Sequence, residues 1–175
     1  MTVRAPIAGL LLATAVTGIV ALGACSEEAG TLDPAATERA VGRAVAAEVE
    51  PDVSATRCTG ELVRVAGGTF TCTVTLEGAG PLEVDVRQVD DEGTLDVTPT
   101  AAVVATDRIV SELTESLEAQ FKRTFTVRCS GDPIQIRTPS STSTCSARDK
   151  TSAREVTVTV TDRAGTLSFS VAPPK

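Results

Sequence analysis

The sequence predicts an α+β protein built from two tandem modules, each with one helix packed on a three- to four-stranded antiparallel sheet. Three observations predict this fold. Short motifs recur at an offset of about 70 residues. In each half, an apolar stripe of helical period precedes segments in which apolar and polar residues alternate. Each half also holds one pair of cysteines. We expect the modules at residues 34–99 and 100–173.

Four motifs of the first half return in the same order in the second half. They are Thr37–Val41 with Thr106–Val110, Arg57–Gly60 with Arg128–Gly131, Thr69–Cys72 with Thr142–Cys145, and Gly93–Leu95 with Gly165–Leu167. A constant order at a nearly constant offset indicates two homologous units rather than chance similarity.

Residues 1–24 have the features of an export signal. Arg4 provides a positive start, and no charged residue occurs from Ile7 to Ala24. The segment ends in Leu22-Gly23-Ala24-Cys25, which resembles the lipobox of bacterial lipoproteins. That resemblance implies cleavage before Cys25 and acylation of its sulfur with fatty acids such as palmitate. Two acyl chains are enough for stable membrane attachment.

Residues 25–33 are predicted to be a lipidated tether, small and acidic in composition. We therefore expect an exported protein that is anchored by lipid to the outer face of the cell membrane. An ordinary signal or an uncleaved spanning helix with an incidental Cys is the alternative reading of this terminus.

The helix of the first module is predicted to begin after Asp33, with Pro34 at its first position. Its apolar face is formed by Val41, Val45 and Val49, and Pro51 ends it.

The helix of the second module has a stronger stripe, which consists of Ile109, Val110, Leu113, Leu117 and Phe121. Thr100 or Thr106 is expected to cap it. Residues 101–105 either extend this helix backward or belong to the linker.

Alternating segments after each helix predict strands with one buried face and one face in water. They contain Phe70–Leu76, Leu82–Val86 and Leu95–Val97 in the first module, and Phe125–Cys129, Ile134–Ile136, Val156–Val160 and Leu167–Val171 in the second. Residues 91–93 and 163–165 are expected to form hairpin turns.

Four cysteines remain once Cys25 is assigned to the lipid, and four cysteines allow three pairings. The repeat selects Cys58–Cys72 and Cys129–Cys145, because an ancestral module would have carried its own bridge. Each bridge is worth about 3 kcal/mol by loop entropy. The spacings do not fit a zinc site, so we expect structural disulfides, no metal and no redox role.

These features together resemble an actinobacterial lipoprotein domain of unknown function that carries two cysteines. The features are the lipobox, a following helix, Cys58, and the Gly68-x-x-x-Cys72 spacing that leads into alternating strands. The excess of Arg over Lys and the absence of Asn are similarly typical of such proteomes. The resemblance would cover residues 35–172 as two copies. It implies a fold and a location, but no chemistry. A looser similarity is to secreted tandem-repeat inhibitors of β-lactamases.

Composition excludes several function classes. The formal net charge is −7, and the chain has no His, Trp or Tyr. It therefore lacks the basic footprint and stacking surface of a nucleic-acid binder. Without His or another activated nucleophile or base, we expect neither an enzyme nor a cofactor, and no residue has the features of a catalytic group.

Two acidic groups are better explained as solvated surface. Asp90, Asp91 and Glu92 lack the ligand spacing of a calcium loop and fit an exposed hairpin turn. Glu83 and Asp85 alternate with apolar residues, so they should face water, where a carboxyl group is not tuned for acid–base catalysis.

Charge is distributed unevenly between the modules. Residues 35–98 hold 12 acidic and 5 basic side chains, a net −7, whereas residues 99–175 hold 8 acidic and 10 basic side chains, a net +2. One hypothesis is that the second module binds an anionic wall polymer or an acidic envelope protein. Ordinary surface charge is the favoured explanation, because an excess of +2 is small. The candidate anion-binding residues are Arg128, Arg137, Arg148, Lys150 and Arg154.

The sequence leaves two functional classes open. The first is a non-catalytic binding or scaffold module of the cell envelope. The second is an inhibitor or regulator of an envelope enzyme, which would require a contiguous apolar patch. The lack of Tyr and Trp, the usual anchors of tight interfaces, favours the first class.

Overall fold

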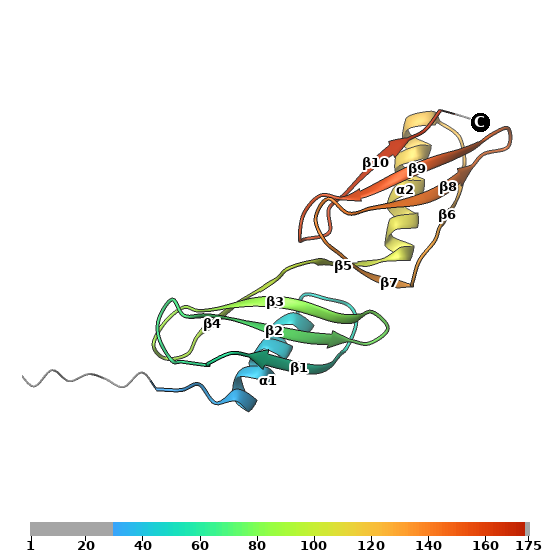
Figure 1. Ribbon diagram of the computed structural model, residues 1–175. Coiled ribbons are helices and arrows are strands. Elements are labelled where there is room, and N and C mark those ends of the chain that lie inside the picture. Colours follow the sequence, from blue (N-terminus) through green and yellow to red (C-terminus); the bar gives the residue numbers. More distant parts are fainter. Residues whose placement is uncertain (1–29, 174–175) are drawn as a thin grey trace, which may run out of the picture.

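The computed structural model describes residues 30–173, which form two modules, each with one helix and antiparallel sheets (Figure 1). The predicted signal at residues 1–24, Cys25 and residues 26–29 of the tether lie outside the described residues. Within residues 30–173, no helix is long and apolar enough to cross a membrane.

The first module consists of one helix and one four-stranded sheet. The helix is α1 (Pro34–Ala46), and the strands are β1 (Val53–Thr59), β2 (Thr69–Leu76), β3 (Gly80–Gln88) and β4 (Leu95–Pro99). The strands pair in the order β1-β2-β3-β4, each antiparallel to its neighbour. The helix covers one face of this sheet, as predicted.

The predicted start of α1 is confirmed. The side chain of Asp33 accepts a hydrogen bond from the backbone N–H of Ala35 at 3.0 Å, and Pro34 stands in the first turn. Val41 and Val45 are fully buried against the sheet. The helix ends at Ala46, before Pro51 is reached, and Val49 remains partly buried at the edge of the core.

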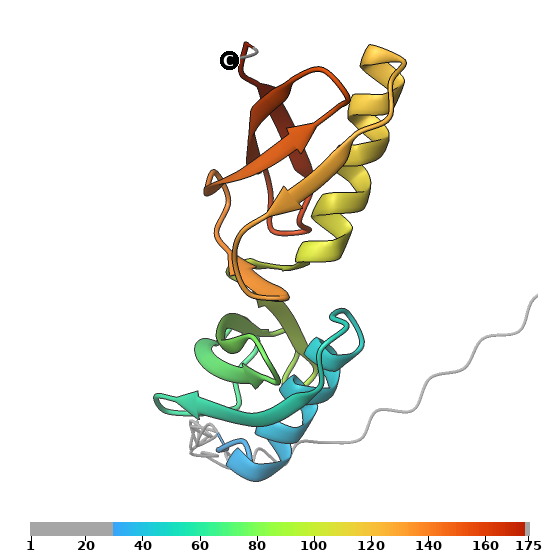
Figure 2. The same ribbon diagram turned by 90° about the vertical axis from the view of Figure 1, so that its right-hand side faces the viewer.

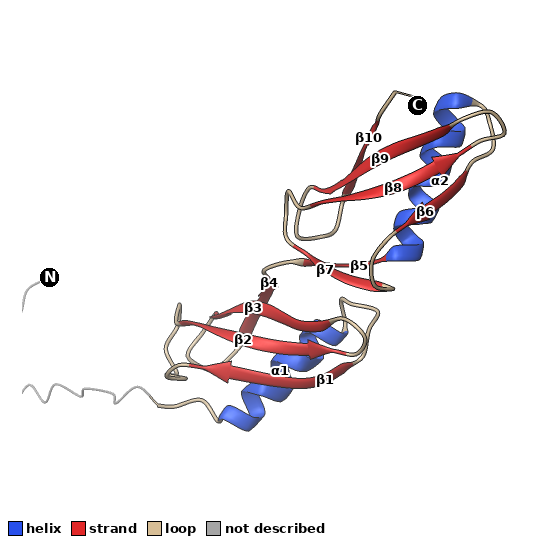
Figure 3. Cartoon of the chain, turned by 45° about the vertical axis from the view of Figure 1, so that its right-hand side comes forward, coloured by secondary structure: helices blue, strands red, loops and turns tan. Residues whose placement is uncertain are grey.

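The second module repeats this arrangement and adds a two-stranded sheet (Figure 3). Its elements are β5 (Ala102–Ala105), α2 (Thr106–Phe121), β6 (Thr126–Cys129), β7 (Ile134–Arg137), β8 (Thr142–Arg148), β9 (Ala153–Val160) and β10 (Leu167–Val171). The main sheet has the order β10-β9-β8-β6, and β5 pairs with β7.

The expected cap of α2 is wrong, and of the two alternatives for residues 101–105 the backward extension of the helix is not formed. The N-cap residue is Ala105, whose side chain has no acceptor, so neither Thr100 nor Thr106 caps the helix. The Thr106 hydroxyl instead donates to the Asp132 carbonyl at 2.6 Å. Residues 102–105 do not extend the helix backward, because the β-branched Val103 and Val104 pair with β7 as a strand.

Both predicted disulfides are present. Cys58 and Cys72 face each other across β1 and β2, with Cα atoms 4.0 Å apart, and Cys129 and Cys145 occupy the same position across β6 and β8 at 4.2 Å. Each bridge therefore joins the strand that follows the helix to the next strand of the sheet.

Besides β5, the sequence did not predict β1 and β8. Each carries a cysteine and many small or hydroxylated residues, so the alternation of apolar residues is weak. The core-facing positions of β8, for example, are occupied by Ser143, Cys145 and Ala147.

Backbone hydrogen bonds recur in the two modules at equivalent positions. The N–H of Gly67 donates to the carbonyl of Gln88 at 2.8 Å, as the N–H of Ser140 donates to that of Val160 at 2.7 Å. A bridge between Thr31 and Val63 in the first module likewise corresponds to the Val103–Ile136 pair of β5 and β7. The repetition therefore extends to loops and to the segment before each helix.

The β5–β7 ribbon joins the modules through its two faces. Ala102 and Val104 are buried in the core of the second module. Val103 and Ile136 lie on the opposite face and pack against the core of the first module. Because one ribbon contributes to both cores, the modules are mechanically coupled.

Replacing Ile136 with Ala is expected to destabilise the first module by about 1–2 kcal/mol, because a partly buried side chain is removed from its core. In scanning calorimetry, we expect a single unfolding transition to separate into two. Ile134→Ala on the same strand is the matched control, because the side chain of Ile134 does not pack against the core of the first module, and this variant should leave that module unchanged. A single unshifted transition for Ile136→Ala would contradict the coupling.

Replacing Ser140 with Gly is expected to stabilise the second module by about 1 kcal/mol, because Ser140 has a φ of 68° where the first module has Gly67. The reciprocal change, Gly67→Ser, should destabilise the first module by a similar amount, since no atom lies near the added Cβ and only the backbone is strained. Urea denaturation measures both effects. A loss of stability in Ser140→Gly would refute the equivalence of the two turns.

Candidate functional site

Each sheet has one face that no helix covers, and we term this its outer face. In Figure 1 both helices lie behind their sheets, and Figure 2 shows the same arrangement from the side. The two outer faces therefore point to the same side of the molecule. They carry the polar residues of the alternating strands.

The outer face of the second module is lined with hydroxyl groups. Those of the three adjacent strands β8, β9 and β10 come from Thr142, Thr144, Ser146, Thr157, Thr159, Ser168 and Ser170. This face has the donors and acceptors to bind a hydroxylated or anionic ligand, but no aromatic ring on which a sugar or a base could stack.

An open groove of about 520 Å³ lies over β6, β8 and β9. Its lining includes Arg128, Ser130, Thr144, Ser146, Ala153 and Glu155. Arg154 also lines this groove, so two of the five predicted cations, Arg128 and Arg154, border it. The other side chains carry no motif, and only their position on the polar side of the strand alternation could have indicated them.

The sheet brings two of the five predicted cations together. Arg128 on β6 lies opposite Ser146 on β8, and Arg148 follows two residues later on β8, so both exposed guanidinium groups project from the outer face. Diagonal neighbours of this kind lie within reach of one ligand.

Two other predicted cations do not project from the outer face, although Arg154 borders the groove. Arg154 is on the core side of β9, where its guanidinium carbon stands 4.7 Å from the centre of the Phe121 ring. Arg137 is half-buried on β7, opposite Ala102, in the ribbon that joins the modules. The predicted cluster of five therefore does not exist as one surface.

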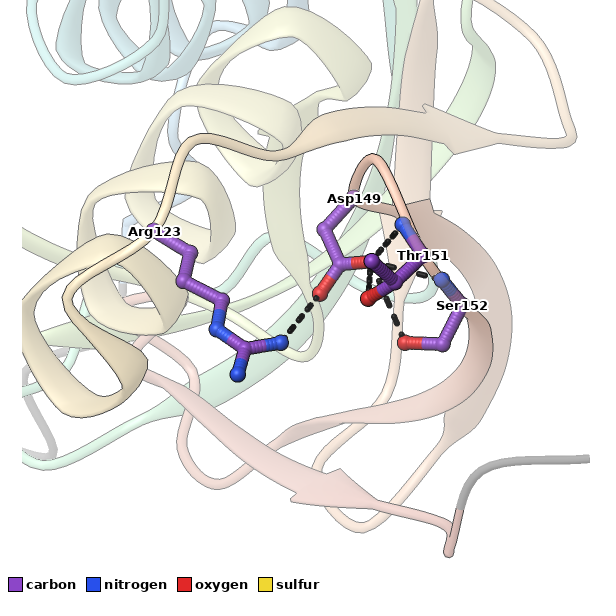
Figure 4. A network of polar contacts seen from close by, with 4 residues as sticks. All are labelled: Arg123, Asp149, Thr151 and Ser152. Carbon is purple, nitrogen blue, oxygen red and sulfur yellow. Dashed lines mark hydrogen bonds and ion pairs between the residues drawn. The ribbon is translucent and has the colours of Figure 1, made fainter.

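Lys150, the fifth predicted cation, is exposed in the turn between β8 and β9. Asp149 organises this turn (Figure 4). Its Oδ1 accepts from the backbone N–H groups of Thr151 and Ser152 at 2.7 and 2.6 Å, and its Oδ2 lies 3.2 Å from Arg123. The Asp149 side chain is only 3% exposed, so a turn of β8–β9 is tied to the end of α2.

These hydrogen bonds determine the protonation of Asp149. The N–H groups of Thr151 and then Ser152 stabilise the carboxylate and hold the pKa of Asp149 far below its ordinary value, although burial acts in the opposite direction. Asp149 is a positioning residue for the turn that presents Lys150.

The outer face of the first module has the opposite character. A groove of about 490 Å³ there is lined by Asp85, Arg87 and Asp96, together with threonines of β2 and β4. Glu83 and Asp85 are exposed, as expected from their alternation with buried residues. Acidic and hydroxyl groups therefore dominate this groove. Arg57 on β1 occupies the position of Arg128, but it forms an ion pair with Glu38 at 3.2 Å.

The acidic segment 90–92 forms the predicted hairpin turn between β3 and β4. The carboxylate of Asp90 accepts from the backbone N–H of Thr94 at 2.8 Å, and hydrogen bonds from Thr94 lower the pKa of Asp90. Asp162 and Thr166 form the same contact at 3.0 Å in the second module, with the same effect on the pKa of Asp162. Within residues 30–173, no group of three or more Cys, Asp or Glu could hold a metal ion.

Gln88 is a buried polar residue that the sequence analysis did not identify. Its Nε2 donates to the Asp90 carbonyl at 2.8 Å, whereas its Oε1 has no hydrogen-bond partner. It occupies the next core-facing position after Val84 and Val86, and its equivalent in the second module is Val160. Gln88 therefore supports the β3–β4 turn.

A known family matches part of the chain, from within the predicted signal to the turn after β3. Residues 15–93 match the family described as Domain of unknown function (DUF4333). The match includes Cys58, Cys72 and the strands that they join. It confirms the expected domain of unknown function for this part of the chain and assigns no activity. No curated protein and no solved structure gives a match to the chain.

Replacing Asp149 with Asn is expected to lower the melting temperature at neutral pH by several degrees, because the charge stabilised by Arg123 and the turn N–H groups is lost. The native pKa lies below the unfolded one, so this stabilisation exists above about pH 4 and is lost as the pH falls further. Circular dichroism melts between pH 3 and 7 should show a weaker acid dependence for the variant.

Glu115→Gln on the exposed surface of α2 is the charge-matched control. It should leave the acid dependence at its wild-type slope. Identical slopes for the wild type and Asp149→Asn would contradict the assigned role of Asp149.

Proposed function

We propose that the protein is an exported lipoprotein that is acylated at Cys25 and anchored to the outer face of an actinobacterial cell membrane. The lipobox sequence Leu22-Gly23-Ala24-Cys25 at the end of an apolar segment supports this proposal. Two disulfides support it further, since such bridges are typical of extracytoplasmic proteins.

The second module is proposed to be a second copy of the domain that the family match identifies in the first. The support is structural equivalence. Strand order, disulfide position and turn hydrogen bonds are the same in both modules.

The activity we propose is non-catalytic binding or scaffolding in the cell envelope, with an anionic wall polymer bound on the outer face of the second module. The observation that carries this proposal is the placement of Arg128 and Arg148 on one uncovered, hydroxyl-lined face beside an open groove. Paired guanidinium groups bind phosphate and carboxylate well, and hydroxyl groups bind polyols. No cofactor and no nucleic acid takes part.

The acidic first module would assist in this arrangement. Its net charge repels an anionic polymer, so contact is directed to the distal module. The alternative, inhibition of an envelope enzyme, has less support, because in the described part of the chain the exposed large hydrophobic residues are only Val65 and Val89.

The Arg128→Ala, Arg148→Ala double variant is expected to reduce binding to purified anionic wall polymer at least tenfold, since both charges on the outer face are removed. The wild type should bind with an affinity that falls as salt rises. Co-sedimentation with the polymer, using the oxidised chain from residue 26 to 175, measures this.

Arg163→Ala is the matched control, because Arg163 is an exposed cation of the β9–β10 turn outside the groove. Equal loss in the control, or salt-independent binding, would refute the polymer site. Stoichiometric, salt-resistant capture of one envelope protein would instead support the inhibitor function.

A further inference from the structure

One end of the first module is formed by three segments that are distant in sequence. They are residues 30–32, 62–68 and 88–94, and we term their surface the basal end. The N–H of Leu32 donates to the Leu62 carbonyl at 2.7 Å, and the N–H of Ala66 donates to Asp91 Oδ1 at 2.9 Å. The chain enters the fold directly at this end, at Gly30 (Figure 1).

The basal end exposes two valines. Val65 is 45% exposed and Val89 is 52% exposed, and they are the exposed large hydrophobic residues in the described part of the chain. Both are at one end of one module, where they add apolar area to a surface that is otherwise polar.

The backbone does not require valine at these positions. Hydrogen bonds place Thr138 of the second module where the first has Val65, and Thr161 where it has Val89. The N–H of Gly68 donates to the Val65 carbonyl, and the N–H of Ser141 donates to the Thr138 carbonyl, both at 3.0 Å. In the same way, the N–H groups of Val89 and Thr161 donate to the carbonyls of Thr94 and Thr166, both at 2.8 Å. Threonine has nearly the same shape, so the difference between the modules is one of polarity.

The corresponding end of the second module is a contact surface. There Val103 and Ile136, the equivalents of Thr31 and Val63, pack against the core of the first module. In the second module this end of the fold therefore packs against another surface. In the first module the same end lies beside the tether, and its contact is with the neighbour of the tether.

The length of the tether identifies that neighbour. Gly30 follows Cys25 by five residues, which span about 18 Å at full extension. This step rests on the proposed acylation of Cys25. With acyl chains in the bilayer, the basal end must remain close to the lipid headgroups, while the second module extends away from it (Figure 3).

We propose that the basal end of the first module lies against the membrane surface, with Val65 and Val89 in contact with the interfacial region of the bilayer. The protein then stands end-on, and the outer face of the second module is presented to the envelope. The anchor makes the contact intramolecular in effect, so a small apolar area is sufficient.

Charge determines which lipid surface this end fits. One cation, Arg64, and four acidic residues belong to it or adjoin it: Glu61, Asp90, Asp91 and Glu92. The excess of acid opposes contact with anionic headgroups within a Debye length of about 8 Å at physiological salt. The contact therefore suits a headgroup surface without net charge.

Paramagnetic relaxation tests this orientation. The chain from Cys25 to Lys175 is coupled through the Cys25 thiol, the cysteine outside the two disulfides, to a maleimide lipid in phosphatidylcholine nanodiscs. A gadolinium-chelating lipid then broadens amides near the surface. We expect several-fold larger enhancement at Val65 and Val89 than at their equivalents Thr138 and Thr161.

The double variant Val65→Thr, Val89→Thr keeps side chains that the second module carries at the same backbone positions, so it should fold. Its enhancement at Ala66 and Asp90 is expected to fall several-fold. The reciprocal control, Thr138→Val with Thr161→Val, should change nothing at the basal end. Phosphatidylglycerol added to the nanodisc should weaken the wild-type enhancement.

The proposal would be overturned if the paramagnetic relaxation enhancement were equal at the equivalent positions of the two modules. An unchanged enhancement in the valine-to-threonine variant would also overturn it. Chemical coupling makes this result independent of natural lipidation. Mass spectrometry of the protein from its own cell envelope tests acylation of Cys25 separately, so failure of the proposed anchor and failure of the proposed orientation can be distinguished.

Discussion

The packing of one helix stripe against the valine-rich face of a sheet is the interaction on which each module depends. Val41 and Val45 of α1, and Ile109, Leu113 and Leu117 of α2, are almost completely buried there. Modules of this size bury little apolar area, and these contain few aromatic rings. In each module a disulfide between the first and second strands compensates for this. It restricts the unfolded chain and so stabilises the module by about 3 kcal/mol.

This solution leaves one face of each sheet uncovered. Because the helix and the disulfide together stabilise the inner face, the outer face is free to vary in chemistry without cost to the core. Arg57 and Arg128 occupy the same position in the two modules, but the first module adds carboxylates such as Asp85 and Asp96, whereas the second adds Arg148. Two modules of the same architecture thus present surfaces of different charge on one side of a single chain.

The junction between the modules shows how the same end of the fold can be reused. The β5–β7 ribbon is a short strand pair before the helix, and the Thr31–Val63 bridge is its reduced form in the first module. Hydrophobic residues on the far face of the ribbon convert an exposed end into an interface. Module coupling therefore requires only a few substitutions and no additional secondary structure.

The sequence alone determined the fold class, the start of α1, the helix stripes and both disulfides, because these depend on local periodicity and on an internal repeat. It did not reveal β1 and β8, whose core positions are filled by cysteine and small residues, nor the strand at residues 102–105, which pairs with a segment about 30 residues away. The charged surface was decided by tertiary structure. Arg128 and Arg148 share a face because their strands are neighbours, whereas Arg154 lies on the core side of β9 and Arg137 in another sheet. Composition gives the number of charged residues, but strand register and the alternation of side chains between the two faces of a sheet determine which charged groups lie close together.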